Sequence, residues 1–196
     1  DITTNAKPHQ VSKIFKTKPT GLKYGTVTIF MGDETFEVTT YRVDGEYVDN
    51  RHPEEVTFCE TVEEDVKRRD FTINGILMTE KGELIDYVNG RADLQMKIIK
   101  TIGEPKQRFT EDALRMMRAF YFQSKLGFQI EKETRDAITE MKDNLKSVAM
   151  ERITNEMIKI LQGGYVKKAL KSMVTTGVHE VIPGLKQGIE YAEQMD

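Results

Sequence analysis

Hydrophobic and polar residues alternate in two runs near the start of the chain, which predicts a β-hairpin. Gly25–Phe30 and Thr35–Val43 both alternate, and Met31-Gly32-Asp33 between them has the composition of a turn. Other short patterns predict four further elements. These are the end of a strand at Asp1–Thr4, a short helix at Pro8–Phe15, and strands at Val56–Cys59 and Leu84–Val88. We expect Gly21–Tyr24 to be a loop.

The apolar period changes to that of helices after Pro105. Glycines at 127, 163–164 and 177 are typical helix stops. The predicted helices are Thr110–Leu126, Lys132–Met141, Ala149–Leu161 and Tyr165–Thr175. The sequence therefore predicts a mixed α/β part followed by an all-helical part, without internal repeats.

A charged segment, VEEDVKRRDFTING at 62–75, precedes a run of apolar and small residues. Because that run is poor helix and good strand or loop material, we expect a buried strand at Phe71–Met78. It would leave Arg68, Arg69 and Asp70 at the edge of a cleft. Two guanidiniums suit phosphate, and a carboxylate suits a ribose hydroxyl. The alternative is a surface charge cluster.

A second polar constellation, Glu111-Asp112-x-x-Arg115, lies at the start of the predicted Thr110–Leu126 helix, where Thr110 is the expected cap. The spacing places these side chains on neighbouring faces, so one interpretation is a surface ion-pair ladder worth about 0.2–0.5 kcal/mol per pair. The other interpretation is nucleobase recognition. Asp112 can accept from the exocyclic amino group of cytosine or adenine, while Arg115 donates to the ring nitrogen beside it. Uracil and guanine present the inverse pattern, which would leave buried polar groups unpaired.

Composition narrows the class of protein. The 196 residues are 38% hydrophobic and 31% charged, as in soluble globular proteins, and no apolar run has the length of a membrane span. The first residues resemble neither a secretion signal nor a transit peptide. Cys59 is the single cysteine, which excludes an intramolecular disulfide and a multi-cysteine zinc site and fits a reducing cytoplasm. The net charge of −3 gives no general attraction to nucleic acid.

One local region is basic. Met141–Thr175 has seven Lys or Arg against three Asp or Glu, a local charge of +4. It is either an RNA-binding patch or ordinary charge on helix surfaces.

Two motifs together resemble the class II tRNA nucleotidyltransferases, the CCA-adding enzymes, and their bacterial poly(A) polymerase relatives. They are RRDFTIN at 68–74 and E-D-x-x-R-x-x-R at 111–118, about forty residues apart. The likeness runs from Asp1 to about Leu185. It implies an α+β fold, with a mixed β-sheet nucleotidyltransferase head of the DNA polymerase β type followed by an all-helical neck and body. The implied domains are the head at 1–105, a helical neck with the nucleobase-recognition helix at 106–155, and the start of the body at 156–196.

The resemblance also implies an activity and roles for the motif residues. Such enzymes add C and A to the 3′ end of tRNA from CTP and ATP without a template, in the cytoplasm, releasing pyrophosphate. The implied nucleotide-binding residues are Arg68, Arg69, Asp70, Asn74, Glu111, Asp112, Arg115 and Arg118. Asp112 and Arg115 would select the base and Glu111 would position Arg115. Asp70 would bind the ribose, Arg69 with Arg68 the triphosphate, Asn74 would buttress the turn, and Arg118 would reach phosphate or brace the helix.

The catalytic metal site is implied by the same resemblance. The family holds two Mg²⁺ ions with an Asp-x-Asp pair, preceded by a GGxxRD loop, and a third carboxylate on an adjacent strand. Asp1 corresponds to the second aspartate and Glu37 to the third carboxylate. The first aspartate, the GGxxRD loop and most of the C-terminal body and tail are not in this sequence. We therefore expect an N-terminally incomplete head that does not catalyse efficiently as given.

Alternative functions remain open, and several residues are assigned no chemical role. A poly(A), C-only or A-only adding enzyme shares all these motifs, and a non-catalytic nucleotide- or RNA-binding module is an alternative of a different class. Asp44–Pro53 resembles a flexible head loop, although a plain hairpin loop is the alternative. We expect Met116, Met117, Phe120, Tyr121 and Phe122 to be helix core, and His9, His52 and His179 to have no catalytic or metal role.

Overall fold

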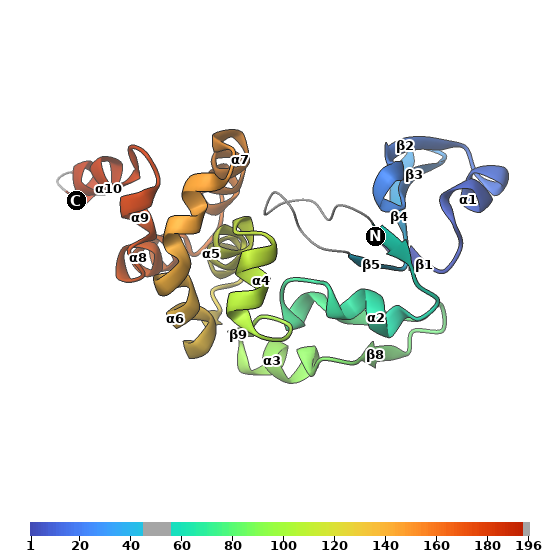
Figure 1. Ribbon diagram of the computed structural model, residues 1–196, viewed down its shortest axis with the longest axis horizontal. Coiled ribbons are helices and arrows are strands. Elements are labelled where there is room, and N and C mark those ends of the chain that lie inside the picture. The colour runs from blue at the N-terminus through green and yellow to red at the C-terminus, as the bar shows by residue number, and fades with distance from the viewer. Residues whose placement is uncertain (45–55, 194–196) are drawn as a thin grey trace. The chain divides into compact units, whose positions relative to one another are not determined.

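The structure, a computed structural model, describes residues 1–44 and 56–193, which form two compact units (Figure 1). The described part of the first unit comprises residues 1–44 and 56–69, and that of the second comprises residues 70–193. The predicted head loop is Asp44–Pro53, and all of it beyond Asp44 lies outside the described residues. The expected domain boundaries at 105 and 155 stay predictions.

The first unit is built on a four-stranded mixed sheet. Its strands, in spatial order, are β1 (Ile2–Thr4), β4 (Glu34–Thr40), β3 (Thr26–Met31) and β2 (Thr17–Gly21). The predicted hairpin is confirmed as β3 and β4, where Met31 faces Glu34 across a two-residue turn. β1 runs parallel to β4. The helix α1 (Pro8–Ile14) supplies Val11 to the small core that Val27, Ile29 and Val38 form.

The predicted strand Thr35–Val43 is wrong at its end. Beyond Tyr41 the chain starts β5 (Arg42–Asp44), which pairs with β6 (Val56–Phe58) instead of continuing along β3. The backbone N–H of Arg42 donates to the Asp65 carboxylate, so it is not available to the first sheet. The unit also contains a 3-10 turn, η1 (Leu22–Tyr24), where a loop was expected, and the short helix α2 (Val62–Lys67).

The second unit begins with short elements. They are η2 (Thr72–Asn74), β7 (Ile76–Met78), β8 (Leu84–Asp86), α3 (Gly90–Met96) and β9 (Ile98–Ile99). The predicted strand Phe71–Met78 is wrong in its first half. Phe71 makes only an isolated bridge to Thr101, and the chain then turns before β7 pairs with β8. The Asp70 carboxylate draws the turn together by accepting from the Phe71 N–H and from Asn74 Nδ2.

The remainder of the second unit is helical. Its elements are α4 (Pro105–Glu111), α5 (Leu114–Leu126), β10 (Gln129–Ile130), α6 (Lys132–Met141), η3 (Lys142–Ser147), α7 (Met150–Leu161), α8 (Val166–Thr175), α9 (Val178–Val181) and α10 (Leu185–Glu193). Three predicted helices are confirmed to within one residue, as α6, α7 and α8. None of the described helices combines the length and apolar character needed to cross a bilayer.

The predicted helix Thr110–Leu126 is wrong at its start, since the chain forms two helices there. Asp112 has an extended backbone, with φ −145° and ψ 105°, and separates α4 from α5. Its carboxylate accepts the Leu114 N–H at 3.0 Å, which favours a new helix start over continuation of α4. Thr110 caps nothing, because its hydroxyl donates to the Lys106 carbonyl within α4.

The helix α5 is the centre of the second unit and packs against α7 and α8 (Figure 1). Met116, Met117 and Phe120 are fully buried, so their prediction as core is confirmed. Tyr121 and Phe122 are partly buried against the same core. The α+β prediction is also confirmed, with the mixed sheet in the first unit and most of the helical residues in the second.

Candidate nucleotide-binding site

A buried carboxylate holds both predicted phosphate-binding arginines in the first unit. Asp65, on α2, is 0% exposed, and its Oδ1 accepts from Arg68 Nε at 3.0 Å. Its Oδ2 accepts from Arg69 Nη2 at 3.0 Å. The arginines lie three and four residues after Asp65, so their side chains reach back over the last turn of the helix. Asp65 was not predicted as a site residue, although its spacing from the arginine pair is visible in the sequence.

The two predicted metal ligands lie on neighbouring strands of the first unit. Ile2 pairs with Val38 in the parallel β1–β4 register, so Asp1 and Glu37, one position earlier, fall side by side. Paired positions of parallel strands share a face. Both side chains are exposed and each offers a carboxylate oxygen, the ligand that Mg²⁺ prefers. Among the described residues there is no group of three or more candidate ligands. The pair fits part of a magnesium site.

In the second unit, Asp70 forms an ion pair with Arg118. Arg118 Nε donates to Asp70 Oδ2 at 2.6 Å, and Asn74 Nδ2 donates to Asp70 Oδ1 at 2.8 Å. Burial by itself lowers the pKa of the Arg118 guanidinium. The Asp70 charge and hydrogen bond, together with the charges of Glu156 and Asp112, outweigh burial and raise that pKa above its usual value. Because each carboxylate oxygen can accept more than one hydrogen bond, Asp70 keeps capacity for a further donor.

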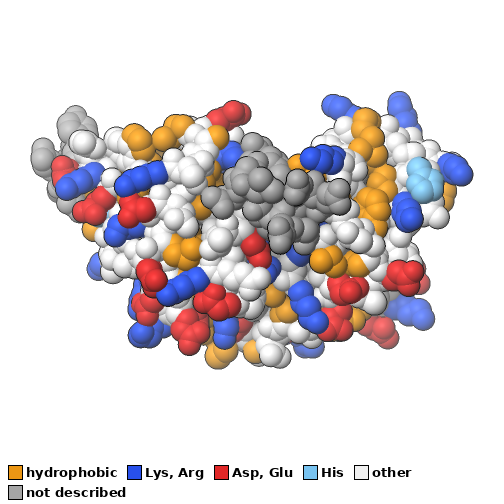
Figure 2. All heavy atoms as spheres, viewed as in Figure 1, with side chains coloured by type: hydrophobic (Ala, Val, Ile, Leu, Met, Phe, Trp, Pro, Cys, Tyr) orange, Lys and Arg blue, Asp and Glu red, His pale blue; other side chains and the backbone are white. Residues whose placement is uncertain are grey.

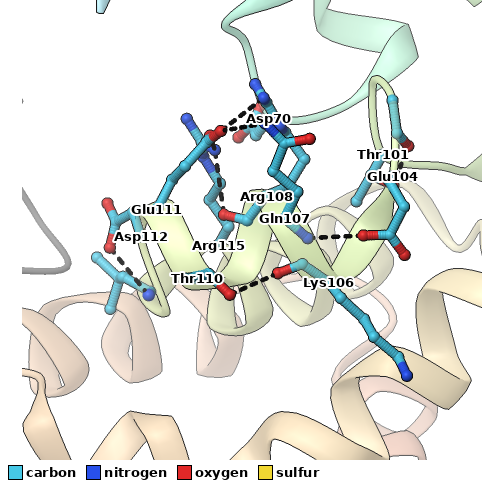
Figure 3. Close-up of polar contacts among 12 residues, drawn as sticks. Asp70, Thr101, Glu104, Lys106, Gln107, Arg108, Thr110, Glu111, Asp112 and Arg115 are labelled. Atoms are coloured by element: carbon cyan, nitrogen blue, oxygen red, sulfur yellow. Dashed lines mark hydrogen bonds and ion pairs between the residues drawn. The ribbon is translucent and has the colours of Figure 1, made fainter. Parts of the chain in front are cut away.

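Glu111 joins two arginines at the end of α4 (Figure 3). Its Oε1 accepts from Arg108 Nη2 at 2.6 Å, and its Oε2 accepts from Arg115 Nη1 at 2.6 Å. Arg115 Nη1 also donates to the Arg108 carbonyl at 3.1 Å. Glu111 therefore contacts Arg115 in the way that a positioning residue would. Arg108, three residues before Glu111, was not predicted.

Asp112 is held from a distant part of the chain. Arg152 Nη2, on α7, donates to Asp112 Oδ2 at 2.9 Å, while Oδ1 accepts the Leu114 N–H. The pair is partly exposed, with side-chain exposures of 20% for Arg152 and 18% for Asp112. No local signal in the sequence links residues forty positions apart, so sequence reasoning missed Arg152.

Chemically, the second unit presents an acceptor and a donor with fixed partners. The Arg115 N–H bonds to the Asp112 carbonyl at 3.0 Å, so the two residues lie within one turn. Salt bridges to Arg152 and to Glu111 fix their side chains. A fixed acceptor beside a fixed donor can discriminate hydrogen-bonding edges, since the wrong edge leaves polar groups unpaired.

Figure 2 shows how charged side chains are distributed on one face of the second unit. Over the helices of the second unit, acidic and basic side chains are interspersed there. The possibility that the basic region Met141–Thr175 binds RNA stays a prediction.

Comparison with known families gives two matches. The family model described as "Poly A polymerase head domain" matches residues 1–100. A second model, described as "Probable RNA and SrmB- binding site of polymerase A", matches residues 127–189.

The curated proteins that this chain resembles include two described as CCA-adding enzymes. The CCA-adding enzyme of Bacillus velezensis is 48% identical over 100% of this chain and 49% of its own length. That of Bacillus subtilis is 46% identical over 94% of this chain and 47% of its own length. This chain thus spans about half the length of the curated relatives it matches.

Solved structures of a CCA-adding enzyme and of a tRNA nucleotidyltransferase also match this chain. The crystal structure of the Bacillus stearothermophilus CCA-adding enzyme in complex with CTP matches with a TM-score of 0.87 and 42% identity, over 94% of this chain and 45% of that one. A tRNA nucleotidyltransferase complexed with a primer tRNA and an incoming ATP analog matches with a TM-score of 0.69 and 27% identity, over 89% and 48% of the two chains.

Proposed function

Because this chain belongs to the family of the poly(A) polymerase head domain, we propose that the protein is a tRNA nucleotidyltransferase. It adds C and A to the 3′ end of tRNA from CTP and ATP, without a nucleic-acid template. The 3′-hydroxyl oxygen attacks the α-phosphorus, the bond to the β-phosphate oxygen breaks, and pyrophosphate leaves. The observation that carries the proposal is the pairing of a fixed acceptor, Asp112, with a fixed donor, Arg115.

Base selection is assigned to these two residues. Asp112 accepts from the amino group shared by cytosine and adenine, and Arg115 donates to the neighbouring ring nitrogen. Glu111 and Arg152 hold the two side chains, so little reorganisation is needed when the base arrives. Uracil or guanine would place a carbonyl against the carboxylate and an N–H against the guanidinium, which strands buried polar groups.

Ribose and phosphate recognition are assigned to the RRDFTIN motif. Asp70 accepts from a ribose hydroxyl, with Asn74 and Arg118 holding its carboxylate. Arg118 is thereby assigned to bracing Asp70 instead of to phosphate. Arg68 and Arg69 neutralise the triphosphate, for which planar guanidiniums with several donors are well suited.

Magnesium would be held by Asp1 and Glu37. When bound, it would supply activation of the attacking hydroxyl and charge stabilisation on the phosphates. The chain's own contribution is positioning, because effective nucleotidyl transfer needs an aligned nucleophile and phosphate. We place the reaction in the cytoplasm, in agreement with the single cysteine.

The test is nucleotide addition by the full-length encoded protein with Mg²⁺. Three tRNA substrates are used, ending before the first C, after CC and after CCA. We expect CTP incorporation on the first, ATP incorporation on the second and none on the third. Addition of A alone or C alone would identify the partial enzymes, and continued A addition to the third would identify a poly(A) polymerase. Nucleotide binding without turnover would support a non-catalytic module and overturn the proposal.

A further inference from the structure

The helix α2 contains a charge arrangement that the proposed roles do not yet use. Asp65 is 0% exposed, and it accepts hydrogen bonds from both arginines of the RRDFTIN motif. It also accepts the backbone N–H of Arg42 at 3.3 Å. A buried carboxylate is costly unless it is paired and hydrogen-bonded, so these donors are what make its burial tolerable.

The arginines are divided between the two oxygens of this one carboxylate. Oδ1 lies 2.9 Å from Arg68 Nη2, and Oδ2 lies 3.0 Å from Arg69 Nη2. The helix ends at Lys67, but Arg68 and Arg69 follow Asp65 by three and four residues, so both side chains reach back to its carboxylate. The two oxygens of the carboxylate therefore help to set the spacing of the two guanidiniums.

Exposure differs sharply within the cluster. The Asp65 side chain is 0% exposed, whereas those of Arg68 and Arg69 are 20% and 25% exposed. The anion lies beneath and the two cations lie toward solvent. One carboxylate with two guanidiniums leaves a net charge of +1, which still favours a polyanion.

We propose that Asp65 is the positioning residue that aims Arg68 and Arg69 at the triphosphate of the incoming nucleotide. The inference rests on the proposed function, because the arginines must bind triphosphate for their orientation to matter. Asp65 itself touches no phosphate. It acts by holding two flexible side chains in one arrangement, which lowers the entropy lost on binding.

The sign of the mutational effect separates positioning from simple charge. Asp65→Asn removes a negative charge from beside a polyanion site, so electrostatics alone predicts tighter binding of CTP. Positioning predicts weaker binding, because an amide cannot hold two guanidiniums as a carboxylate does. The two explanations therefore differ in direction and not only in size.

The experiment measures binding of CTP, tripolyphosphate and cytidine to the full-length protein, with KM and kcat for CTP. For Asp65→Asn we expect binding of CTP and tripolyphosphate to weaken about tenfold, binding of cytidine to be unchanged, and KM to change more than kcat. The matched control is Glu63→Gln on the same helix, whose exposed carboxylate pairs with Lys67; it should bind all three probes as the wild type does. Unchanged or tighter CTP binding by a folded Asp65→Asn protein would overturn the inference.

A double-mutant cycle connects Asp65 to the arginine through which it acts. The penalty of Asp65→Asn should shrink when Arg69→Ala is already present, and independent, additive penalties would count against positioning. If Asp65→Asn fails to fold, Asp65→Glu keeps the charge and moves it by one methylene; CTP binding equal to wild type would then reject the inference. A wild-type protein that binds no CTP would instead overturn the proposed function, and this inference with it.

Discussion

Each unit contains one carboxylate that holds two arginines, and the two clusters are built in opposite ways. In the first unit Asp65 is 0% exposed, while Arg68 and Arg69 are 20% and 25% exposed. In the second unit Glu111 is 16% exposed, and Arg108 and Arg115 are less exposed than it, at 13% and 10%. One cluster turns its cations toward solvent above a buried anion, and in the other all three side chains are largely buried.

The difference matches two kinds of recognition. In the proposed function, a triphosphate is an extended polyanion that cations near the surface can reach, and guanidiniums held by a buried carboxylate present their donors to it. A base edge offers one acceptor at one place, so its donor must be fixed and partly desolvated. In the proposed function, the same residue types would thus give attraction in one cluster and selectivity in the other.

The largest expected effect comes from breaking the Glu111 cluster. Glu111→Gln leaves Arg108 and Arg115 almost buried without their shared anion, which should cost about 2–3 kcal/mol of stability. We also expect kcat/KM for CTP to fall about 100-fold, roughly 2.7 kcal/mol. Thermal unfolding and steady-state kinetics measure the two effects. Glu140→Gln is the control, because the exposed Glu140 carboxylate on α6 pairs with Lys106, which lies on α4 as Glu111 does. An equal loss of stability and of kcat/KM in Glu140→Gln would contradict a special role for Glu111.

A smaller loss is expected where a single cation braces a carboxylate. Arg118→Met removes the partner of Asp70, and kcat/KM for CTP should fall roughly tenfold, about 1.4 kcal/mol. Discrimination between CTP and dCTP should fall with it, because Asp70 is assigned to the ribose hydroxyl. Arg118→Lys should recover part of both. If the CTP to dCTP ratio were unchanged in Arg118→Met, the assignment of Asp70 would be wrong.

The Asp112 side chain offers a milder way to loosen base recognition. Arg152→Ala frees Asp112 Oδ2 but leaves Oδ1 on the Leu114 N–H. We expect preference for CTP over UTP to fall about fivefold, roughly 1 kcal/mol, with little change in unfolding temperature because the pair is partly exposed. Competition assays with both nucleotides give the ratio. A loss of stability without loss of preference would make Arg152 structural.

The Asp86 carboxylate differs from those of Asp65 and Glu111, because its hydrogen bonds come from backbone N–H groups and not from two arginine side chains. It accepts the backbone N–H groups of Val88, Gly90 and Arg91 at the start of α3. Burial tends to raise its pKa, but these hydrogen bonds and the Arg91 charge lower it overall. Asp86→Asn keeps one oxygen for the Val88 and Gly90 N–H groups but loses the acceptor of the Arg91 N–H, which should cost about 1 kcal/mol of stability, as for a typical hydrogen bond, and leave nucleotide selection unchanged.

The pH dependence of that contribution has a definite sign. Because the folded pKa of Asp86 is depressed, its stabilisation is complete above the unfolded value of about 3.9 and is lost as the pH falls through the folded pKa. The wild type and Asp86→Asn should therefore differ in denaturant midpoint at pH 7 and converge at the lowest pH. A difference that grows on acidification would contradict this assignment.

The sequence was sufficient for the family and for regular elements. RRDFTIN and E-D-x-x-R-x-x-R carry the resemblance that the family match bears out, and clear apolar periods located α6, α7 and α8. It was not sufficient where a side chain competes with the backbone. Asp112 accepts the Leu114 N–H and Asp70 accepts the Phe71 N–H, and each ended the element that propensity predicted.

Side-chain ion pairs also divide into those that the sequence predicts and those that it does not. Pairs three or four residues apart, such as Glu111 with Arg115, were predictable from spacing. Asp65 has that spacing from Arg68 and Arg69, and Arg108 has it from Glu111, but neither Asp65 nor Arg108 is part of the two motifs that carry the resemblance. Arg118 with Asp70 and Arg152 with Asp112 depend on how distant elements pack, which no local pattern specifies.

The most direct measurement is single-turnover incorporation of CTP against UTP by the full-length protein, on a tRNA that ends before the first C. Asp112→Asn offers an amide donor where the wild type offers only acceptors, so it can meet the uracil carbonyl. We predict that the CTP to UTP ratio falls at least about 100-fold, roughly 2.7 kcal/mol, while the exposed-carboxylate control Asp136→Asn keeps the wild-type ratio. A ratio in Asp112→Asn within twofold of wild type would show that the base is read elsewhere.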